Sequence, residues 1–181
     1  NGQASYAFYD ENTAGRMITA AEMPALPASI TTLFFGGISL MVEPGGAAYE
    51  ALMEREAGSG RVMMLDPNIR PSFIADVPRY RARIAKMTAR ADIVKISDED
   101  LHWLEGDGDL GSLAARVLAQ GPKVVFITEG AKGAHAFTAR DAVFRPAQKV
   151  TVADTVGAGD TFNAGVLAAL LAGSFVPENV D

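Results

Sequence analysis

Short, continuous apolar runs recur along this chain, and each is followed by a segment with helical features. The runs are Val62–Leu65, Ile93–Ile96, in which Lys95 is the one interruption, and Val124–Thr128. Runs of this length and composition are typical of strands buried on both faces of a sheet. Because strands that alternate with helices form mostly parallel sheets covered by helices, the pattern predicts an α/β fold, and the length fits one domain.

The remaining elements follow from helix signals and from alternation. Ser97 has the position of an N-cap, and Gly58 and Gly121 have the positions of helix stops. Helices are predicted over Pro44–Glu56, Pro78–Ala91, Asp98–Leu104, Leu110–Leu118 and Asp160–Ala172. Further strands are predicted over Ala4–Tyr9, Thr31–Phe35, Ala134–Thr138 and Ala142–Arg145, the last two as a hairpin.

Charge and composition make several classes of function unfavourable. Sixteen basic and 22 acidic residues give a net charge of −6, which is a poor match for nucleic acid or anionic lipid. The chain has no cysteine, so it holds no disulfide and no thiolate metal site, and a cytoplasmic location is favoured. No apolar stretch is long enough to span a membrane, so no membrane partner is expected.

The segment from Asp154 to Phe162 carries the sharpest chemical signal. It reads Asp-Thr-Val-Gly-Ala-Gly-Asp-Thr-Phe and stands directly before a predicted helix. Small residues leave backbone amides accessible, and a helix N-terminus is partially positive, so the segment predicts an anion site. Asp160, at the start of that helix, would lie beside the bound anion, where an acid can serve as a general base toward an attacking hydroxyl.

Taken alone, this glycine spacing has a second interpretation as a plain turn capped by an acid. The segment lacks the Lys-Ser/Thr pair of a P-loop and does not have the dinucleotide-binding spacing. The spacing by itself therefore leaves both interpretations open.

The whole segment, however, closely resembles the C-terminal signature of the ribokinase-like (PfkB-type) carbohydrate kinases. Other segments occur in the order of that family: Asp66-Pro67-Asn68-x-Arg70, Ser97-x-x-Asp100 and Thr128-x-Gly130-x-x-Gly133. The stretch Gly36–Pro44 is similar to bacterial fructokinases in particular. The resemblance covers nearly all 181 residues.

The resemblance implies a three-layer αβα core with a mostly parallel sheet, and an ATP-dependent sugar kinase. The first candidate reaction is conversion of fructose to fructose 6-phosphate. Kinases for 2-keto-3-deoxygluconate or ribose are alternatives within the family. A non-catalytic nucleotide-binding regulatory relative is the alternative from another class.

The resemblance also assigns roles to the signature segment. Asp160 would be the catalytic base, and the amides of Gly157, Ala158 and Gly159 would stabilise the transferred phosphoryl group. Asp154 and Thr155 resemble ligands of the monovalent cation, K⁺, that many members bind.

Nucleotide and metal sites are implied in two other loops. Thr128, Gly130 and Gly133 match the loop that passes the ATP phosphates, and Lys132 of this loop either reaches a phosphate or is solvated. Where the family often has Asn-x-x-Glu for Mg²⁺, this chain has Ser97 to Asp100. Asp100 would hold Mg²⁺ through water, with Glu99 as the nearby substitute. The same residues also suit a helix cap, and the two interpretations are compatible.

The implied sugar-site residues are Asn68 and Arg70 after a strand, and Tyr6 and Phe8 near the N-terminus. A structural salt bridge is the alternative for Arg70, and a core position is the alternative for one face of the aromatic segment. Family members are considerably longer than this chain. Residues 1–181 are therefore expected to form a partial kinase domain, without the N-terminal β lid and sugar-site portion and without the extreme C-terminus. A homodimer would form through that lid.

Overall fold

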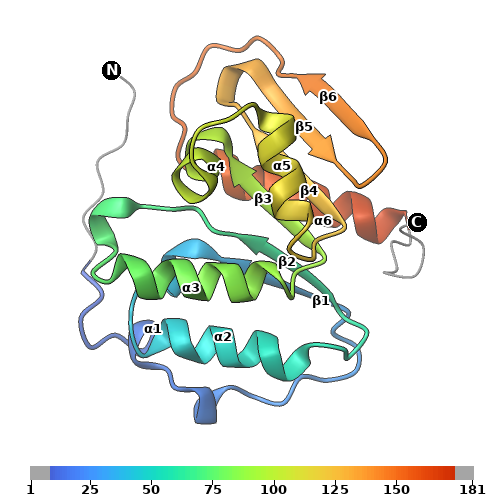
Figure 1. Ribbon diagram of the computed structural model, residues 1–181. Helices are drawn as coiled ribbons and strands as arrows, with labels where there is room; N and C mark the ends of the chain where they lie inside the picture. Colours follow the sequence, from blue (N-terminus) through green and yellow to red (C-terminus); the bar gives the residue numbers. More distant parts are fainter. Residues whose placement is uncertain (1–8, 174–181) are drawn as a thin grey trace.

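Within residues 9–173, six strands form one sheet in the order β1-β2-β3-β4-β5-β6 (Figure 1). The structure is a computed structural model that describes residues 9–173. Strands β1 to β4 are parallel, and β5 and β6 continue the sheet as an antiparallel hairpin. Their bounds are Thr32–Gly36, Val62–Asp66, Ile93–Ser97, Val124–Thr128, Gly133–Phe137 and Ala142–Pro146. The mostly parallel α/β fold and the terminal hairpin are thereby confirmed.

Helices connect the parallel strands and follow the hairpin. The α-helices are α1 Ala14–Met17, α2 Gly45–Glu56, α3 Val77–Thr88, α4 Asp98–Glu105, α5 Leu110–Leu118 and α6 Ala158–Ala172. Short 3₁₀ turns are η1 Ala20–Glu22, η2 Gly37–Leu40, η3 Pro71–Phe73 and η4 Gly130–Lys132. The Ser97 hydroxyl accepts a hydrogen bond from the Asp100 amide at 3.0 Å, which confirms the predicted N-cap of α4.

Some predicted boundaries were wrong. Helix α3 ends at Thr88 rather than Ala91, because the chain turns there and the Asp92 amide joins the Met63 carbonyl at the start of the sheet. Helix α6 begins at Ala158, two residues before the predicted start. The predicted strand Ala4–Tyr9 lies outside the described residues except for Tyr9, which is exposed and is not in a strand.

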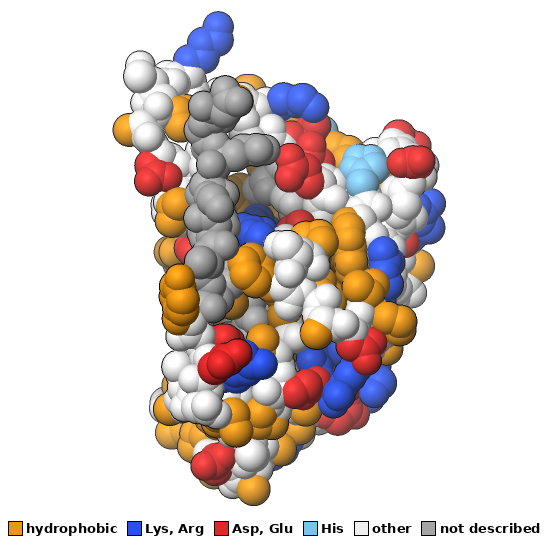
Figure 2. Space-filling model, turned by 90° about the vertical axis from the view of Figure 1, so that its left-hand side faces the viewer, with side chains coloured by type: hydrophobic (Ala, Val, Ile, Leu, Met, Phe, Trp, Pro, Cys, Tyr) orange, Lys and Arg blue, Asp and Glu red, His pale blue; other side chains and the backbone are white. Residues whose placement is uncertain are grey.

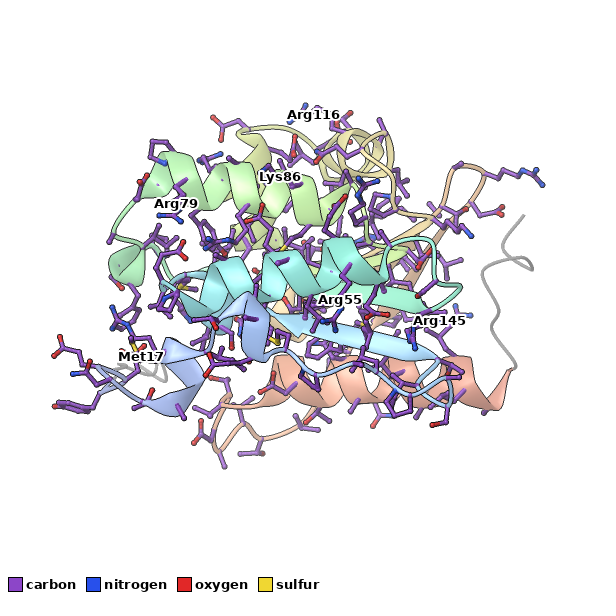
Figure 3. The ribbon with its side chains drawn as sticks, turned by 90° about the horizontal axis from the view of Figure 1, so that it is seen from below. Met17, Arg55, Arg79, Lys86, Arg116 and Arg145 are labelled. Carbon is purple, nitrogen blue, oxygen red and sulfur yellow. The ribbon has the colours of Figure 1, made fainter. Side chains whose placement is uncertain are left out.

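The two faces of the sheet are covered by different helices, as the layered view in Figure 3 shows for α2 and α3 on one side and α6 on the other. The larger core joins one face of the sheet to α2, α3, α4 and α5. The smaller core joins the other face to Val166, Leu167 and Leu170 of α6. On that second face Phe34 remains 42% exposed. These layers confirm the αβα arrangement, and residues 9–173 contain a single sheet with no separate β lid.

Most basic residues of α3 and of the turn after it pair with acidic residues of the same chain. Arg83 is buried and donates to Glu50 at 3.1 Å, to the Leu40 carbonyl at 2.7 Å and to Glu43. Lys86, labelled on α3 in Figure 3, also pairs with Glu50. Ion pairs with Glu43, Glu50 and Glu54, which lie in α2 or just before it, therefore account for most of the basic residues of this segment. Among residues 9–173, no helix combines the length and apolar character needed to cross a membrane.

Candidate functional site

The loops singled out by sequence meet at one edge of the sheet. The parallel register places Gly36 beside Asp66 and Ser97 beside Thr128, so the carboxyl ends of β1 to β4 lie together. In open α/β sheets, ligands bind beyond this edge. Figure 2 views the molecule from the left-hand side of Figure 1, and acidic and basic side chains are interspersed on that face rather than gathered in a patch of one sign.

Helix α6 presents its N-terminus at this edge through a turn that requires glycine. Gly157 is the N-cap and has φ +78°, a left-handed conformation that glycine adopts without strain. The Ala158 amide donates to the Thr155 carbonyl at 3.2 Å and is therefore engaged within the turn. Helix geometry leaves the amides of Gly159 and Asp160 without intrahelical acceptors. These two amides are the donors that an anion would meet.

Asp160 and Asp154 lie on either side of this turn, and both are exposed. Asp160 stands in the first turn of α6, where the helix dipole stabilises its carboxylate. One carboxylate oxygen of Asp154 accepts a hydrogen bond from the Val156 amide at 2.9 Å. That bond leaves the second oxygen of Asp154 available to a cation. The neighbouring Thr155 is exposed as well.

A buried polar cluster beneath the turn was missed by sequence reasoning. It consists of Asp66 at the end of β2, Lys95 within β3 and Asn163 in α6, which are 3%, 5% and 2% exposed. Lys95 Nζ and Asn163 Nδ2 both reach Oδ2 of Asp66, at 3.1 and 2.7 Å. The signal available in the sequence was a lysine inside an otherwise apolar strand, since a buried charge requires a partner.

The loop after β2 is tied to the start of α4. The Ile69 amide donates to Oδ2 of Asp100 at 3.1 Å, which brings the Asn68–Arg70 segment beside the predicted magnesium residue. Burial raises the pKa of the Asp100 carboxyl, and the Ile69 bond and the charge of Arg70 partly oppose that rise. Asn68 has φ +41° and donates its amide to Asp66 at 3.2 Å. Arg70 donates to the Ile69 carbonyl at 2.8 Å.

Some residues of the loop after β4 that are predicted to border the nucleotide also have structural roles. Gly133 has φ +137°, and a Cβ there would lie 2.1 Å from the Arg145 carbonyl oxygen of β6. Close packing of the hairpin therefore requires this glycine. Gly130 has φ +53° with open space around it, and Thr128 is half-buried at the strand end. Lys132 pairs with Glu129 at 2.8 Å, and that bond, together with the charge of Asp98 on α4, raises the pKa of Lys132.

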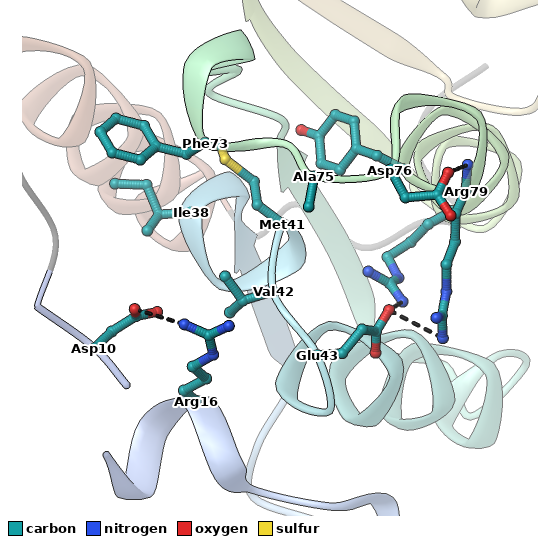
Figure 4. A pocket seen from close by; sticks show the side chains of 12 residues that line it. Asp10, Arg16, Ile38, Met41, Val42, Glu43, Phe73, Ala75, Asp76 and Arg79 are labelled. Carbon is teal, nitrogen blue, oxygen red and sulfur yellow. Dashed lines mark hydrogen bonds and ion pairs between the residues drawn. The ribbon is translucent and has the colours of Figure 1, made fainter. Parts of the chain in front are cut away.

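A separate cavity of about 320 Å³ lies beside the segment after β1 (Figure 4). Its lining includes Ile38 and Phe73 and two ion pairs, Asp10 with Arg16 at 2.9 Å and Glu43 with Arg79 at 3.1 Å. These charged groups already have partners. The Gly36–Pro44 stretch thus contributes to a pocket, as its place after a parallel strand suggests.

Two predicted features are not located among residues 9–173: the aromatic sugar-site residues and a complete set of metal ligands. Tyr6 and Phe8 lie outside the described residues. Within residues 9–173, no three His, Cys, Asp or Glu side chains converge in a way that could hold a metal ion. Any metal bound at this edge would therefore need ligands from water or from a bound phosphate in addition to Asp100 or Asp154.

Comparison with known families extends over almost the whole chain. The family model of the pfkB family carbohydrate kinases matches residues 5–180. The chain belongs to the pfkB family. This match confirms the family resemblance that the sequence predicts. The pfkB match includes the glycine turn, Asp160 and the loops after β2, β3 and β4.

Individual pfkB relatives are similar over about half of their own length. A fructokinase of Rhizobium leguminosarum bv. trifolii is 58% identical over 170 residues, which are 94% of this chain and 52% of that protein. A fructokinase of Klebsiella pneumoniae is 31% identical over 181 residues, covering 99% of this chain and 58% of that protein. The chain therefore spans about half the length of the curated relatives it matches.

Solved structures show the same relationship. The fructokinase of Vibrio cholerae O395, in a form with fructose, ADP and calcium ion bound, superposes with a TM-score of 0.78 at 26% identity, covering 86% of this chain and 50% of that one. A ribokinase II of E. coli, described as putative and in complex with ATP and Mg²⁺, gives a TM-score of 0.73 at 26% identity, covering 79% and 46%. These superpositions confirm the ribokinase-like architecture.

Proposed function

We propose that the protein transfers a phosphoryl group from ATP to a hydroxyl of a small sugar, with fructose as substrate and fructose 6-phosphate as product. The observation that carries the proposal is the first turn of α6. Asp160 and two amides without intrahelical acceptors follow a left-handed glycine at the carboxyl edge of the sheet. The family membership and the 58% identity to a fructokinase support fructose over other sugars.

In this mechanism, the chain contributes a base and an anion site. Asp160 is exposed, so its carboxylate is accessible to a sugar hydroxyl and accepts the proton as the oxygen attacks phosphorus. The Gly159 and Asp160 amides donate to the oxygens of the transferred group. Phosphoryl transfer depends mainly on positioning and charge stabilisation, which this helix terminus supplies.

The nucleotide would arrive with Mg²⁺, and Asp100 is the residue of this chain that suits it. One Asp100 oxygen is engaged by the Ile69 amide, and carboxylate oxygens are ligands that Mg²⁺ accepts directly or through water. Glu99, which is exposed, is the substitute. The metal would neutralise charge on the phosphates. Thr128, Gly130 and Lys132 would border the phosphates, and Asp154 with Thr155 would hold K⁺.

A substrate panel with the protein at its full natural length tests the proposal. ADP formation is measured with fructose, 2-keto-3-deoxygluconate and ribose as separate acceptors. The proposal expects the highest kcat/KM with fructose. A higher value for another sugar would transfer the assignment to that sugar.

The non-catalytic alternative makes a different prediction. Titration calorimetry would then show ATP binding, while no sugar in the panel would yield ADP. The intact Asp160 and glycine turn support the catalytic assignment. Dimerisation through a lid and a cytoplasmic location stay predictions.

A further inference from the structure

The buried cluster of Asp66, Lys95 and Asn163 joins three elements at one point. Oδ2 of Asp66 accepts from Lys95 at 3.1 Å and from Asn163 at 2.7 Å, while Oδ1 accepts from the Asn68 amide at 3.2 Å. The carboxylate thus joins the end of β2, the middle of β3 and the first turns of α6. Asn163 is 97 residues from Asp66, so this bond is a long-range tie between α6 and the sheet.

Lys95 lies directly against the glycine turn. A Cβ added to Gly159 would be 3.2 Å from Lys95 Nζ, which places the ammonium group beside the backbone whose amide faces the anion. Among residues 9–173, the Lys95 ammonium donates to Oδ2 of Asp66, at 3.1 Å. A positive charge in a buried site acts on nearby groups with little screening by water.

The orientation of Asn163 is set by this cluster. Its Nδ2 must face the Asp66 carboxylate, because the amide oxygen would repel it. Oδ1 of Asn163 is buried and has no hydrogen-bond partner within residues 9–173. An unpaired buried acceptor costs stability, so the placement of this side chain is not explained by stability alone.

The same reasoning applies to the ion pair. Replacing a buried pair by apolar side chains of similar volume is often neutral or stabilising, so burial of Asp66 and Lys95 is weak grounds for a stabilising role. Lys95 also interrupts an apolar strand whose neighbours Val94 and Ile96 are 2% and 1% exposed. A charge at this position therefore calls for a functional explanation.

We propose that Asp66, Lys95 and Asn163 are positioning residues for phosphoryl transfer. The Asp66–Asn163 bond holds the first turns of α6, with Asp160 and the Gly159 amide, against the carboxyl end of β2. The Lys95 ammonium adds positive potential beneath the turn that receives the transferred phosphoryl group. This inference rests on the proposed kinase function.

The test is the double variant Asp66→Asn with Lys95→Met in the protein at its full natural length. It removes both charges together and leaves an acceptor oxygen at position 66 for Asn163, so no buried charge is stranded. The melting temperature is expected to stay within about 5 °C of wild type, since buried pairs can be replaced at little cost. The kcat is expected to fall about 10- to 100-fold, somewhat less than loss of a direct oxyanion donor, with each KM within about threefold.

The single variant Lys95→Met separates positioning from folding. It strands the Asp66 carboxylate and is expected to melt below the double variant, while its kcat is equally low. A purely structural cluster predicts the opposite coupling, in which the double variant recovers kcat together with its melting temperature. That recovery would overturn the proposal, as would a raised KM for ATP with unchanged kcat.

Two glycines of α6 provide a matched pair of smaller changes. Gly159→Ala places a methyl group against Lys95 Nζ, whereas Gly165 has nothing within 4 Å of the equivalent position. Gly165→Ala is expected to preserve kcat. Gly159→Ala is expected to lower it about 10-fold or more by displacing Lys95 or the turn. Equal kcat values for the two variants would contradict close coupling between Lys95 and the turn.

Failure of this inference is distinguishable from failure of the proposed function. If wild-type protein forms no ADP with any sugar of the panel, the kinase assignment fails. If wild type is active and the double variant retains kcat within threefold, only the positioning role fails.

Discussion

Two buried cations, Arg83 and Lys95, are held in contrasting ways. Arg83 is 4% exposed and donates to three acceptors, the Glu43 and Glu50 carboxylates and the Leu40 carbonyl. Lys95 is 5% exposed and pairs with one carboxylate, that of Asp66, which is itself buried. The first arrangement joins α2 to α3, and the second lies under the N-terminus of α6.

The difference separates a structural charge from a functional one. The Arg83 carboxylates reach solvent in part and also serve Lys86 and Arg79, so they keep much of their hydration and share several cations. The Asp66 carboxylate has lost nearly all of its hydration and holds a single cation beside the glycine turn. Charges that stabilise the fold are thus paired repeatedly at half-exposed positions, whereas the costly buried pair is kept where a phosphoryl group would bind.

The largest expected effect is a fall in kcat and concerns Asp160, which follows the glycine turn. Asp160→Asn keeps the size and capping ability of the side chain but cannot accept a proton. General-base catalysis contributes roughly 10²–10⁴-fold, and kcat should fall by that factor with ATP affinity nearly unchanged. Steady-state kinetics and nucleotide titration on the natural-length protein measure both quantities. A variant within a few-fold of wild type would remove Asp160 from the mechanism.

On the structural side, Arg83→Met should reduce stability instead of kcat. The variant leaves Glu43, Glu50 and the Leu40 carbonyl without their shared donor. Because both carboxylates are partly exposed, the expected loss is about 2–3 kcal/mol, below the range for fully buried pairs. Urea denaturation measures the loss, with kcat per folded molecule as the control. A large fall in kcat at unchanged stability would place Arg83 in the functional group.

A smaller effect is expected at the predicted cation residue Asp154. If K⁺ binds there, it would set the geometry and the field of the glycine turn. Activity should rise several-fold between a bulky organic cation and K⁺, and Asp154→Ala should abolish the rise. Equal rates in the two salts for wild type would contradict the cation site.

The smallest effect concerns Asp100, whose pKa is raised by burial. A raised pKa in the folded state means that this group favours folding when protonated, and that this contribution is lost as pH rises from the ordinary Asp value near 4 through the raised pKa. Asp100→Asn should therefore gain stability relative to wild type across that interval and keep the gain at neutral pH. Denaturation at pH 3.5 and pH 7 tests the sign. A relative loss of stability at pH 7 would contradict it.

The same variant should lose activity if Asp100 supports Mg²⁺. Raising the Mg²⁺ concentration should then restore part of the rate, because the weakened site fills again. A rate that is independent of Mg²⁺ concentration in both proteins would leave only the Asp100–Ile69 contact as its role.

Much of the fold could be predicted because its signals are local. Strand β4 and helix α5 have the predicted bounds, since a bounded apolar run and a capped amphipathic segment each specify their own ends. The glycine turn before α6 was also local, and its left-handed Gly157 agrees with the expected turn.

The missed features depend on long-range contacts. Lys95 is 29 residues from Asp66, and Arg83 is 33 residues from Glu50, so neither partner can be identified from neighbouring sequence. Gly133 was assigned by sequence to the loop that passes the ATP phosphates, and only the distance to Arg145 reveals that hairpin packing requires a glycine there. Local sequence thus predicts groups that would touch a ligand, whereas the contacts that hold these groups in place depend on residues far apart in the chain.

The most direct test of the central claim compares the two cation clusters in one fructose-dependent assay. The kcat per folded molecule and the melting temperature are measured for wild type, for Arg83→Met, and for the double variant at Asp66 and Lys95. The account predicts a lower melting temperature with preserved kcat for Arg83→Met, and a melting temperature near that of wild type with reduced kcat for the double variant. A double variant that keeps wild-type kcat, or an Arg83→Met protein that loses kcat while melting like wild type, would contradict it.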